Sequence, residues 1–349
     1  MPTGSVGAVH WRPDRGREAV ARAPHGSSSG AFSGAPATSP SPAASGAPLG
    51  SPQLSAAGGR RAQLFIDARH GLGNRLRAIA SAAVIAARTG RELVIVWQPD
   101  AHCAARFSEL FEHDGPVIET AFPGVFALAG GRLWNYMEVE PGAVKDAPVL
   151  ADEAPGTPPA RQDDVYVRSA YPLVSPHTSW PEERAFLMGL RPVPEVVELV
   201  RSVAAPSRVA VHVRMASGPG YEHLPWESPE EWTAEGHAEL VAWRARSHAR
   251  HFMARLDALV AEGRAGTIFL AADLPATYDA FRDRYGARLR FLPRTVHDRS
   301  AEQLRHALAD MLLLGRAERF LGSTWSSFTD MARRLAPGPL TVEMSGRDF

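Results

Sequence analysis

Hydrophobic residues form short runs and helical repeats near the start of the ordered sequence. Leu64–Asp67 and Leu93–Trp97 are apolar runs of strand length. Between them, apolar residues recur at helical spacing from Leu76 to Ala87, and Gly90 is expected to end that helix. A strand, a Gly-rich turn, a helix and a second strand together predict a βαβ unit.

The pattern is equally regular after residue 208. Val209–Val213 is predicted as a strand, and a long helical region then runs to about Glu262. Further elements alternate to the end of the chain: strand Thr267–Ala272, helix Ala276–Tyr285, strand Leu289–Leu292, helix Glu302–Leu314, strand Arg319–Leu321, helix Ser326–Leu335 and strand Leu340–Val342. This alternation predicts a mostly parallel sheet that is covered by helices on both faces.

The middle of the chain, residues 112–207, has many prolines and weak periodicity. Val165–Val167 is strand-like, so we expect the remaining strands of a first domain here, followed by a crossover near Pro192–Pro206. The sequence thus predicts an α/β protein in three parts: a disordered tail over 1–62, a first α/β domain over 63–200, and a second α/β domain over 201–349.

The composition of the first 62 residues sets them apart. Ala23–Gly59 is mostly serine, alanine, glycine and proline and contains no acidic residue, lysine or arginine, which predicts disorder. Asp14 and Glu18 are the only acids among many arginines. That bias is typical of an organelle transit peptide, although a plain flexible tail or a misassigned start codon explains it equally well.

Overall composition narrows the class of protein. The 349 residues carry a formal net charge of zero, so the basic excess typical of nucleic-acid binders is missing. The single cysteine, Cys103, can form neither an internal disulfide nor a cysteine zinc cluster. No segment reaches the roughly 18 apolar residues of a membrane span, and the N-terminus lacks a signal core. We therefore expect a cytoplasmic protein, or an organellar one targeted through residues 1–60.

The first motif, Gly71-Leu72-Gly73-Asn74-Arg75, joins the first strand to its helix. Glycines there allow close backbone approach to a ligand, and a helix start supplies free N–H groups. Leu76 stands where a dinucleotide fingerprint would have its third glycine, so a tight turn is the alternative explanation.

Two further motifs follow predicted strands. His212-Val213-Arg214 ends one strand, and Ala271-Ala272-Asp273 ends another. Ligands of open α/β sheets bind at this edge, where an arginine can hold a diphosphate through two parallel hydrogen bonds. The Asp273 carboxylate suits the N–H groups of guanine, although a helix N-cap is the commoner role for aspartate.

The fourth motif, Gly322–Thr329, lies between a strand and a helix and is rich in hydroxyl groups. Hydroxyls and backbone N–H groups at a helix start can hold phosphate, whereas capping alone needs one hydroxyl. We therefore predict that phosphate binds to Ser323, Thr324, Ser326, Ser327 and Phe328. The three C-terminal motifs together indicate one phosphate site.

The order of these motifs resembles the protein O-fucosyltransferase superfamily, which includes the nodulation-type α1,6-fucosyltransferases. The likeness rests on Gly-x-Gly-Asn, His-x-Arg, Ala-Ala-Asp, and Asp310 followed by Phe320–Ser323 and Ser326–Phe328, and it covers about residues 64–345.

This resemblance implies two Rossmann-like halves that face across a cleft, the GT-B arrangement. The domain over 63–200 would be the acceptor side, and the domain over 201–349 would bind the nucleotide sugar. It also implies a GDP-fucose donor, inversion at the anomeric carbon, and neither metal nor cofactor. Arg214 would then be the catalytic diphosphate ligand beside His212, with Asp273 near the base. The Ser326–Phe328 segment would bind phosphate, and Gly71, Gly73, Asn74 and Arg75 would face the acceptor. Met215 stands where some members carry a second arginine.

Other functions remain open at this point. The same architecture could use another nucleotide sugar, or bind one without catalysis, and an NAD-linked oxidoreductase is a third class. The acceptor is expected to be a carbohydrate or other hydroxyl compound, and Asp67 and Glu222 are the only candidates for its base. A run of arginines is predicted to form a solvated helix face: Arg244, Arg246, Arg250 and Arg255.

Overall fold

The computed structural model describes residues 61–120, 131–144, 146–153, 163–204, 207–224, 226–227, 230 and 232–349. The predicted disordered tail lies outside these residues, apart from Arg61 and Ala62, and so does the possible targeting segment.

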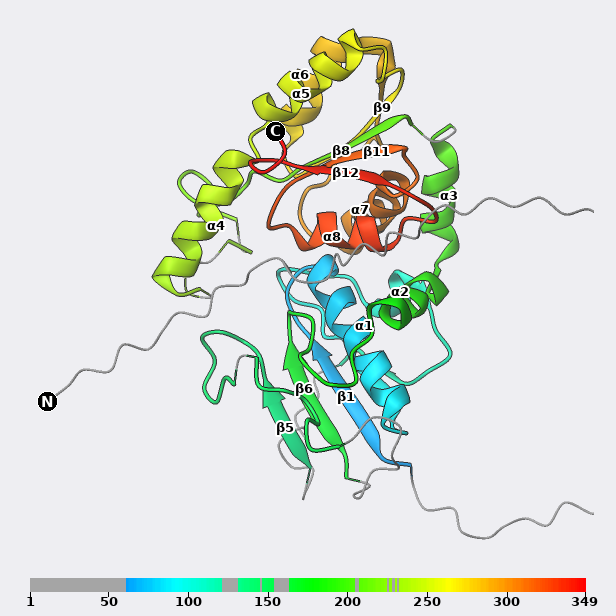
Figure 1. Ribbon diagram of the computed structural model, residues 1–349, viewed down its shortest axis with the longest axis vertical. Coiled ribbons are helices and arrows are strands. Elements are labelled where there is room, and N and C mark those ends of the chain that lie inside the picture. The colour runs from blue at the N-terminus through cyan, green and yellow to red at the C-terminus, as the bar shows by residue number, and fades with distance from the viewer. Residues whose placement is uncertain are drawn as a thin grey trace, which may run out of the picture. The chain divides into compact units, whose positions relative to one another are not determined.

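Two separate parallel β-sheets confirm the predicted α/β class (Figure 1). The first sheet has the strand order β4-β2-β1-β6-β5, and the second has the order β10-β9-β8-β11-β12. All pairings within both sheets are parallel. The strands of the first sheet are β1 (Gln63–Ala68), β2 (Glu92–Val96), β4 (Val117–Ile118), β5 (Arg132–Asn135) and β6 (Val165–Ser169). Those of the second are β8 (Val209–Val213), β9 (Ile268–Ala272), β10 (Leu289–Arg290), β11 (Arg319–Gly322) and β12 (Thr341–Met344).

Helices connect and cover these strands. The α-helices are α1 (Leu72–Arg88), α2 (Trp180–Gly189), α3 (Pro194–Ser202), α4 (Ala234–Arg246), α5 (Ala249–Ala261), α6 (Pro275–Tyr285), α7 (Ala301–Leu314) and α8 (Ser327–Arg334). Short 3₁₀ helices η1 (Phe107–Glu109) and η4 (Gly286–Arg288), and the antiparallel pair β3 (Phe111–Glu112) and β7 (Arg191–Pro192), complete the described elements.

The sequence pattern located most of these elements but misjudged some. The long helical region before Glu262 is two helices, because Ser247 and His248 interrupt it: Ser247 is buried against Ser345, and His248 caps α5. Helices α2 and α3 went unpredicted because their first turns contain proline, which favours helix starts as well as loops. The predicted domain boundary after residue 200 falls within α3, and it stays a prediction.

The second sheet is buried on both faces. Val209, Val211 and Val213 of β8 pack in one cluster with Phe252 of α5. The intervening Ala210 belongs to the other cluster, which includes residues of α1, α7 and α8. His212 shares the side of β8 on which Ala210 lies, because side chains alternate along a strand. This register directs His212 toward α8.

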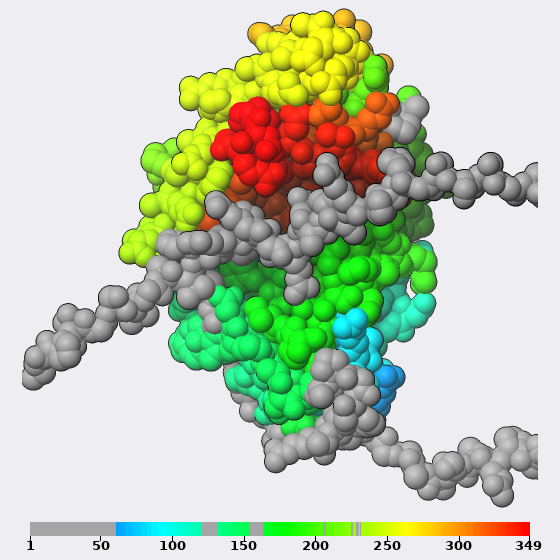
Figure 2. Space-filling model, viewed as in Figure 1, coloured from blue at the N-terminus to red at the C-terminus, as the bar shows by residue number. Residues whose placement is uncertain are grey.

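Helices α1 and α8 lie against each other between the two sheets (Figure 1). In the space-filling view, the yellow to red C-terminal residues lie in the upper part of the picture and the blue to cyan N-terminal residues in the lower part (Figure 2). Buried Arg334 of α8 forms an ion pair with Glu183 of α2 at 3.0 Å, and its guanidinium lies 3.8 Å from the ring centre of Trp180.

The first turns of α1 and α8 are in direct contact at Gly73. A Cβ at position 73 would lie 2.7 Å from the carbonyl carbon and oxygen of Ser327 and 2.9 Å from the amide nitrogen of Phe328. These are backbone atoms, so a side chain at position 73 would force the helices apart. Glycine is therefore required for this approach, and it brings two helix N-termini together.

We expect Gly73→Ala to destabilise the protein by about 1–3 kcal/mol, because overpacking against backbone cannot be relieved by a rotamer change. Urea unfolding measures this loss. Gly189→Ala is the matched control, because no atom lies within 4 Å of a Cβ there. Equal stability of the two variants would contradict the close contact.

Candidate functional site

Three adjacent strands of the second sheet end in polar residues at one edge. Arg214, Asp273 and Ser323 directly follow β8, β9 and β11, which are neighbours in the order β9-β8-β11. The Ser323 hydroxyl donates to the carbonyl oxygen of His212 at 2.9 Å and accepts from the Arg214 amide at 2.9 Å. The sequence-predicted residues therefore share one locality, at the start of α8.

The Arg214 guanidinium is already engaged within the protein. Its Nη1 donates to Asp273 Oδ2 at 2.7 Å and to the carbonyl oxygen of Ala216 at 2.6 Å, and its Nη2 donates to Glu227. Burial acts to lower the pKa of Arg214, but Asp273 and Glu227 outweigh it and raise that pKa. Arg214 thus stays charged and organises two carboxylates.

Asp273 is the acceptor around which the 214–216 turn is built. Its Oδ2 accepts from the amides of Met215 at 2.8 Å and Ala216 at 2.7 Å, besides Arg214. Burial acts to raise the pKa of Asp273, but Arg214 and the two amides hold it below its usual value. The other oxygen, Oδ1, is buried and has no partner among the described residues.

The hydroxyl groups of the Gly322–Thr329 motif are largely used for structure. The Thr324 hydroxyl donates to the Ser345 carbonyl at 2.6 Å, and Ser326 caps α8 by accepting from the Thr329 amide at 3.4 Å. Ser323 is fully buried. The motif therefore has more hydroxyl groups than helix capping needs because some of them form hydrogen bonds with residues far away in the sequence. The sequence alone did not reveal these partners.

What α8 offers a ligand is its backbone. Ser327 and Phe328 are its first two residues, and amides in the first turn have no acceptor within their own helix. They carry the positive end of the helix dipole. A phosphate group bound at this segment would thus contact its N–H groups more than its hydroxyls.

His212 is a buried neutral residue of this site. Its Nδ1 lies 2.8 Å from the Thr329 hydroxyl, and its ring stacks on Phe328 at 4.5 Å between centroids. Burial lowers the pKa of His212 to about 3, with Arg214 and Arg244 adding to the effect and Asp273 opposing it. The imidazole holds the α8 start against β8 and carries no charge at neutral pH.

The glycine loop of the first half reaches the same place. Gly73 touches Ser327 and Phe328, and Asn74 is half-buried in the first turn of α1. Arg75 differs from the expectation that it faces an acceptor. Its fully buried guanidinium donates to the carbonyl oxygens of His70 and Gln98 and to Asp100, so it braces the loop from inside.

Two further arginines, Arg244 and Arg299, lie near this group, and neither was predicted from the sequence as a site residue. Arg244 was predicted on a solvated face, yet it is 8% exposed, and its Nε and Nη1 have no partner among the described residues. Its Nη2 donates to the Trp325 carbonyl at 3.3 Å. Burial lowers its pKa to about 9, and the like charge of Arg214 contributes.

Arg299 approaches from the segment before α7. Its Nη1 would lie 3.6 Å from a Cβ at position 71, and its guanidinium lies over Trp226 at 4.8 Å. The described residues provide no hydrogen bond or ion pair to this guanidinium. Burial lowers its pKa to about 10, with Arg214 adding to the effect.

A second group of polar atoms without partners includes an oxygen of Asp273. Buried side-chain atoms that lack a hydrogen bond to any described residue are found here: Asp273 Oδ1, Thr277 Oγ1, His297 Nδ1 and Asp310 Oδ1. Asp310 is paired with Arg294 at 2.7 Å, whose guanidinium lies near the ring of Tyr278. Such atoms can bind the polar edge of a ligand.

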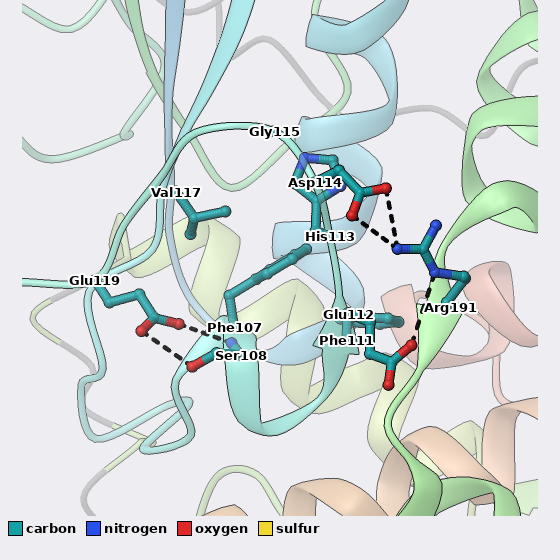
Figure 3. Close-up of a pocket in the computed structure, with 10 residues that line it drawn as sticks. All are labelled: Phe107, Ser108, Phe111, Glu112, His113, Asp114, Gly115, Val117, Glu119 and Arg191. Carbon is teal, nitrogen blue, oxygen red and sulfur yellow. Dashed lines mark hydrogen bonds and ion pairs between the residues drawn. The ribbon is translucent and has the colours of Figure 1, made fainter.

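A cavity of about 610 Å³ lies elsewhere, in the first half (Figure 3). Phe107, Phe111 and Val117 contribute apolar side chains, and Arg191 pairs with Glu112 and Asp114. None of the predicted site residues lines it. Among the described residues, no cluster of three or more histidine, cysteine, aspartate or glutamate residues could hold a metal ion. No helix in the described part of the chain is long and apolar enough to cross a bilayer.

Two parallel sheets connected by helices make up a two-part α/β fold. No protein-family model and no curated protein sequence matches the chain. Among solved structures, the fucosyltransferase NodZ from Bradyrhizobium is similar with a TM-score of 0.51 and 20% identity, over 79% of this chain and 93% of that one. At that identity, the likeness establishes the fold.

Two other solved structures are similar at lower TM-scores. POFUT1 in complex with GDP matches with a TM-score of 0.48 and 15% identity, over 82% of this chain and 98% of that one. An Arabidopsis thaliana FUT1 mutant in complex with GDP matches with a TM-score of 0.47 and 16% identity, over 81% of this chain and 70% of that one.

The environment of His212 predicts a specific acid sensitivity. The folded pKa of about 3 lies below the ordinary value of 6.5, so the unfolded chain binds more protons between these pH values. This group therefore costs no stability above pH 6.5 and removes stability as the pH falls below it.

His212→Gln keeps a hydrogen-bonding group but does not titrate. Between pH 7 and pH 5, urea unfolding should show that the wild-type protein loses about 2 kcal/mol more stability than the variant. Equal losses in the two proteins would mean that His212 is not held neutral in the folded state.

Proposed function

We propose that the protein is a glycosyltransferase that transfers fucose from GDP-fucose to a hydroxyl acceptor, with inversion and without a metal ion. One observation carries the proposal: Arg214 and the start of α8 form one site, linked through Ser323, at the carboxyl edge of the second sheet. Nucleotides bind at this edge in open α/β sheets. The NodZ-like fold supports the reaction class.

The chemistry of such a transfer matches the charges in the site. As the C1–O bond to the diphosphate breaks, negative charge develops on the leaving group. Backbone N–H groups of Ser327 and Phe328, at the positive end of α8, would stabilise that charge together with nearby guanidinium groups. Preorganised donors of this kind are each worth roughly 3–4 kcal/mol of barrier reduction.

The polar atoms beside β9 favour guanine as the base. Guanine presents two adjacent N–H donors and two acceptors, whereas uracil presents one N–H donor. The partnerless carboxylate oxygens of Asp273 and Asp310 are acceptors, and they suit a base with more than one donor. This supports a GDP-sugar over a UDP-sugar.

We place the acceptor on the first half, where the Gly71–Asn74 loop meets α8. No base is proposed. Asp67 accepts hydrogen bonds from Tyr166 at 2.7 Å and from Arg168, and the Glu222 carboxylate accepts from the Gly220 amide at 2.7 Å. Both carboxylates are thus engaged in local structure.

Ligand-induced stabilisation tests the donor. We expect GDP-fucose to raise the melting temperature by several degrees at saturation and GDP-mannose to raise it less. UDP-sugars and NAD should not raise it, because only a guanine nucleotide would contact both the start of α8 and the partnerless oxygens of Asp273 and Asp310. Mass spectrometry should detect slow GDP release from GDP-fucose without acceptor. Stabilisation by GDP without any such release would indicate a non-catalytic binding protein, and stabilisation by NAD alone would contradict the proposal.

Arg214 is tested best by a substitution that keeps its charge. Removing the side chain would leave buried Asp273 and Glu227 uncompensated, at a cost of about 3–5 kcal/mol. Arg214→Lys should fold but lower the rate of GDP release by about 100-fold or more, because the forked geometry that positions both carboxylates is lost. Unchanged turnover in a folded Arg214→Lys protein would remove Arg214 from the mechanism.

A further inference from the structure

The proposed site contains more positive charge than its carboxylates balance. Asp273 and Glu227 both pair with Arg214. Arg244 and Arg299 lie close enough to this group for their pKa values to respond to all three of its members. Neither has a carboxylate partner among the described residues. The site therefore holds three cations and two anions.

We infer that Arg244 and Arg299 bind the diphosphate of the nucleotide sugar. This inference rests on the proposed function and names residues for its central step. Arg214 neutralises two carboxylates and fixes the turn between them, and the other two arginines supply the cations that have no carboxylate partner among the described residues.

The state of Arg244 is the strongest argument. A buried guanidinium without partners is costly, and proteins normally pair such groups. Two of the three nitrogen atoms of the Arg244 guanidinium are buried without a partner among the described residues. The third reaches the Trp325 carbonyl, one residue before the cap of α8. An anion at the α8 start would supply the missing acceptors.

Arg299 has the corresponding position at the start of α1. Its guanidinium nitrogen lies close to Gly71, the N-cap of that helix. Its backbone is fixed from both sides: its carbonyl accepts from the Ala104 amide at 3.1 Å, and its amide donates to Gln303 at 2.5 Å. It also adopts a left-handed conformation, with φ of 63°, which is strained for a residue other than glycine.

The two helix starts bring these arginines to one place. Gly73 in the first turn of α1 touches Ser327 and Phe328 in the first turn of α8. Each helix N-terminus attracts negative charge, and each is approached by an arginine that lacks an anionic partner. A diphosphate carries two charged groups, and two helix starts with two guanidinium groups match that distribution.

This chain has Met215 where some members of the similar superfamily carry a second arginine, and that difference fits the assignment. Met215 occupies the position after Arg214, and its sulfur atom accepts from the Ala249 amide at 3.1 Å inside the protein. A second diphosphate ligand cannot come from that position. Arg244 of α4 and Arg299 before α7 provide cations from other parts of the chain.

The test compares Arg244→Gln and Arg299→Gln with Arg250→Gln, an exposed arginine that controls for the lost charge. Calorimetry measures binding of GDP, GMP, guanosine and inorganic pyrophosphate. We expect each site variant to bind GDP and pyrophosphate at least 10-fold more weakly than the wild type does. The loss of affinity should be smaller for GMP than for GDP, and guanosine should bind with wild-type affinity. Arg250→Gln should match the wild type for all four ligands.

Unfolding of the ligand-free proteins separates binding from a structural role. Because a partnerless buried cation is unfavourable, Arg244→Gln should melt at or above the wild-type temperature. A lower melting temperature, together with equal weakening of GDP and guanosine binding, would identify a structural arginine and overturn the inference. Wild-type affinity for pyrophosphate in both variants would also overturn it. If pyrophosphate binds as expected but GDP-fucose binds no better and is not turned over, the anion site stands and the proposed function fails.

Discussion

Three arginine side chains, of which Arg244 is buried, lie near two carboxylates at the edge of the second sheet, and this excess of positive charge governs the site. Arg214 takes both Asp273 and Glu227, which leaves Arg244 and Arg299 without anionic partners in the described structure. Proteins rarely bury charge in this way unless a ligand completes the arrangement. We propose that the folded protein is thus preorganised for an anion, so that stability is given up in the free state to stabilise charge in the bound one.

The fold produces this arrangement through one close contact. Parallel strands place their carboxyl ends at one edge, and α8 begins directly after β11. The absence of a side chain at Gly73 lets the first turn of α1 approach that of α8 within backbone distance. Two helix dipoles of the same sign then point toward one locality, which would be unfavourable without a negative charge between or beside them.

Much of this was predictable from the sequence. The alternation of strands and helices after residue 208 gave the second sheet, and the motifs ending at Arg214, Asp273 and Phe328 do meet at its edge. Their individual roles were harder, because they depend on partners far away in the chain. Thr324 is bound to Ser345, and Thr329 to His212, so hydroxyls that suggested phosphate binding serve packing.

Arg244 and Arg299 could not be found from the sequence. Arg244 lies among other arginines on α4 and α5, and only the tertiary fold turns it inward while Arg246 and Arg250 remain exposed. Arg299 lies in a segment without a motif, and its approach to Gly71 joins residues more than two hundred positions apart. Helices α2 and α3 were missed for a simpler reason, since proline at a helix start resembles proline in a loop.

The central claim is that an anion binds where the first turns of α1 and α8 meet. NMR of protein labelled with ¹⁵N-glycine and ¹⁵N-phenylalanine tests it directly, because Gly71, Gly73 and Phe328 report from that place. Addition of pyrophosphate should shift these three amide signals and leave Phe111 and Gly115, which line the separate cavity of Figure 3, unchanged. Shifts confined to Phe111 and Gly115, with Gly73 and Phe328 unmoved, would contradict the account.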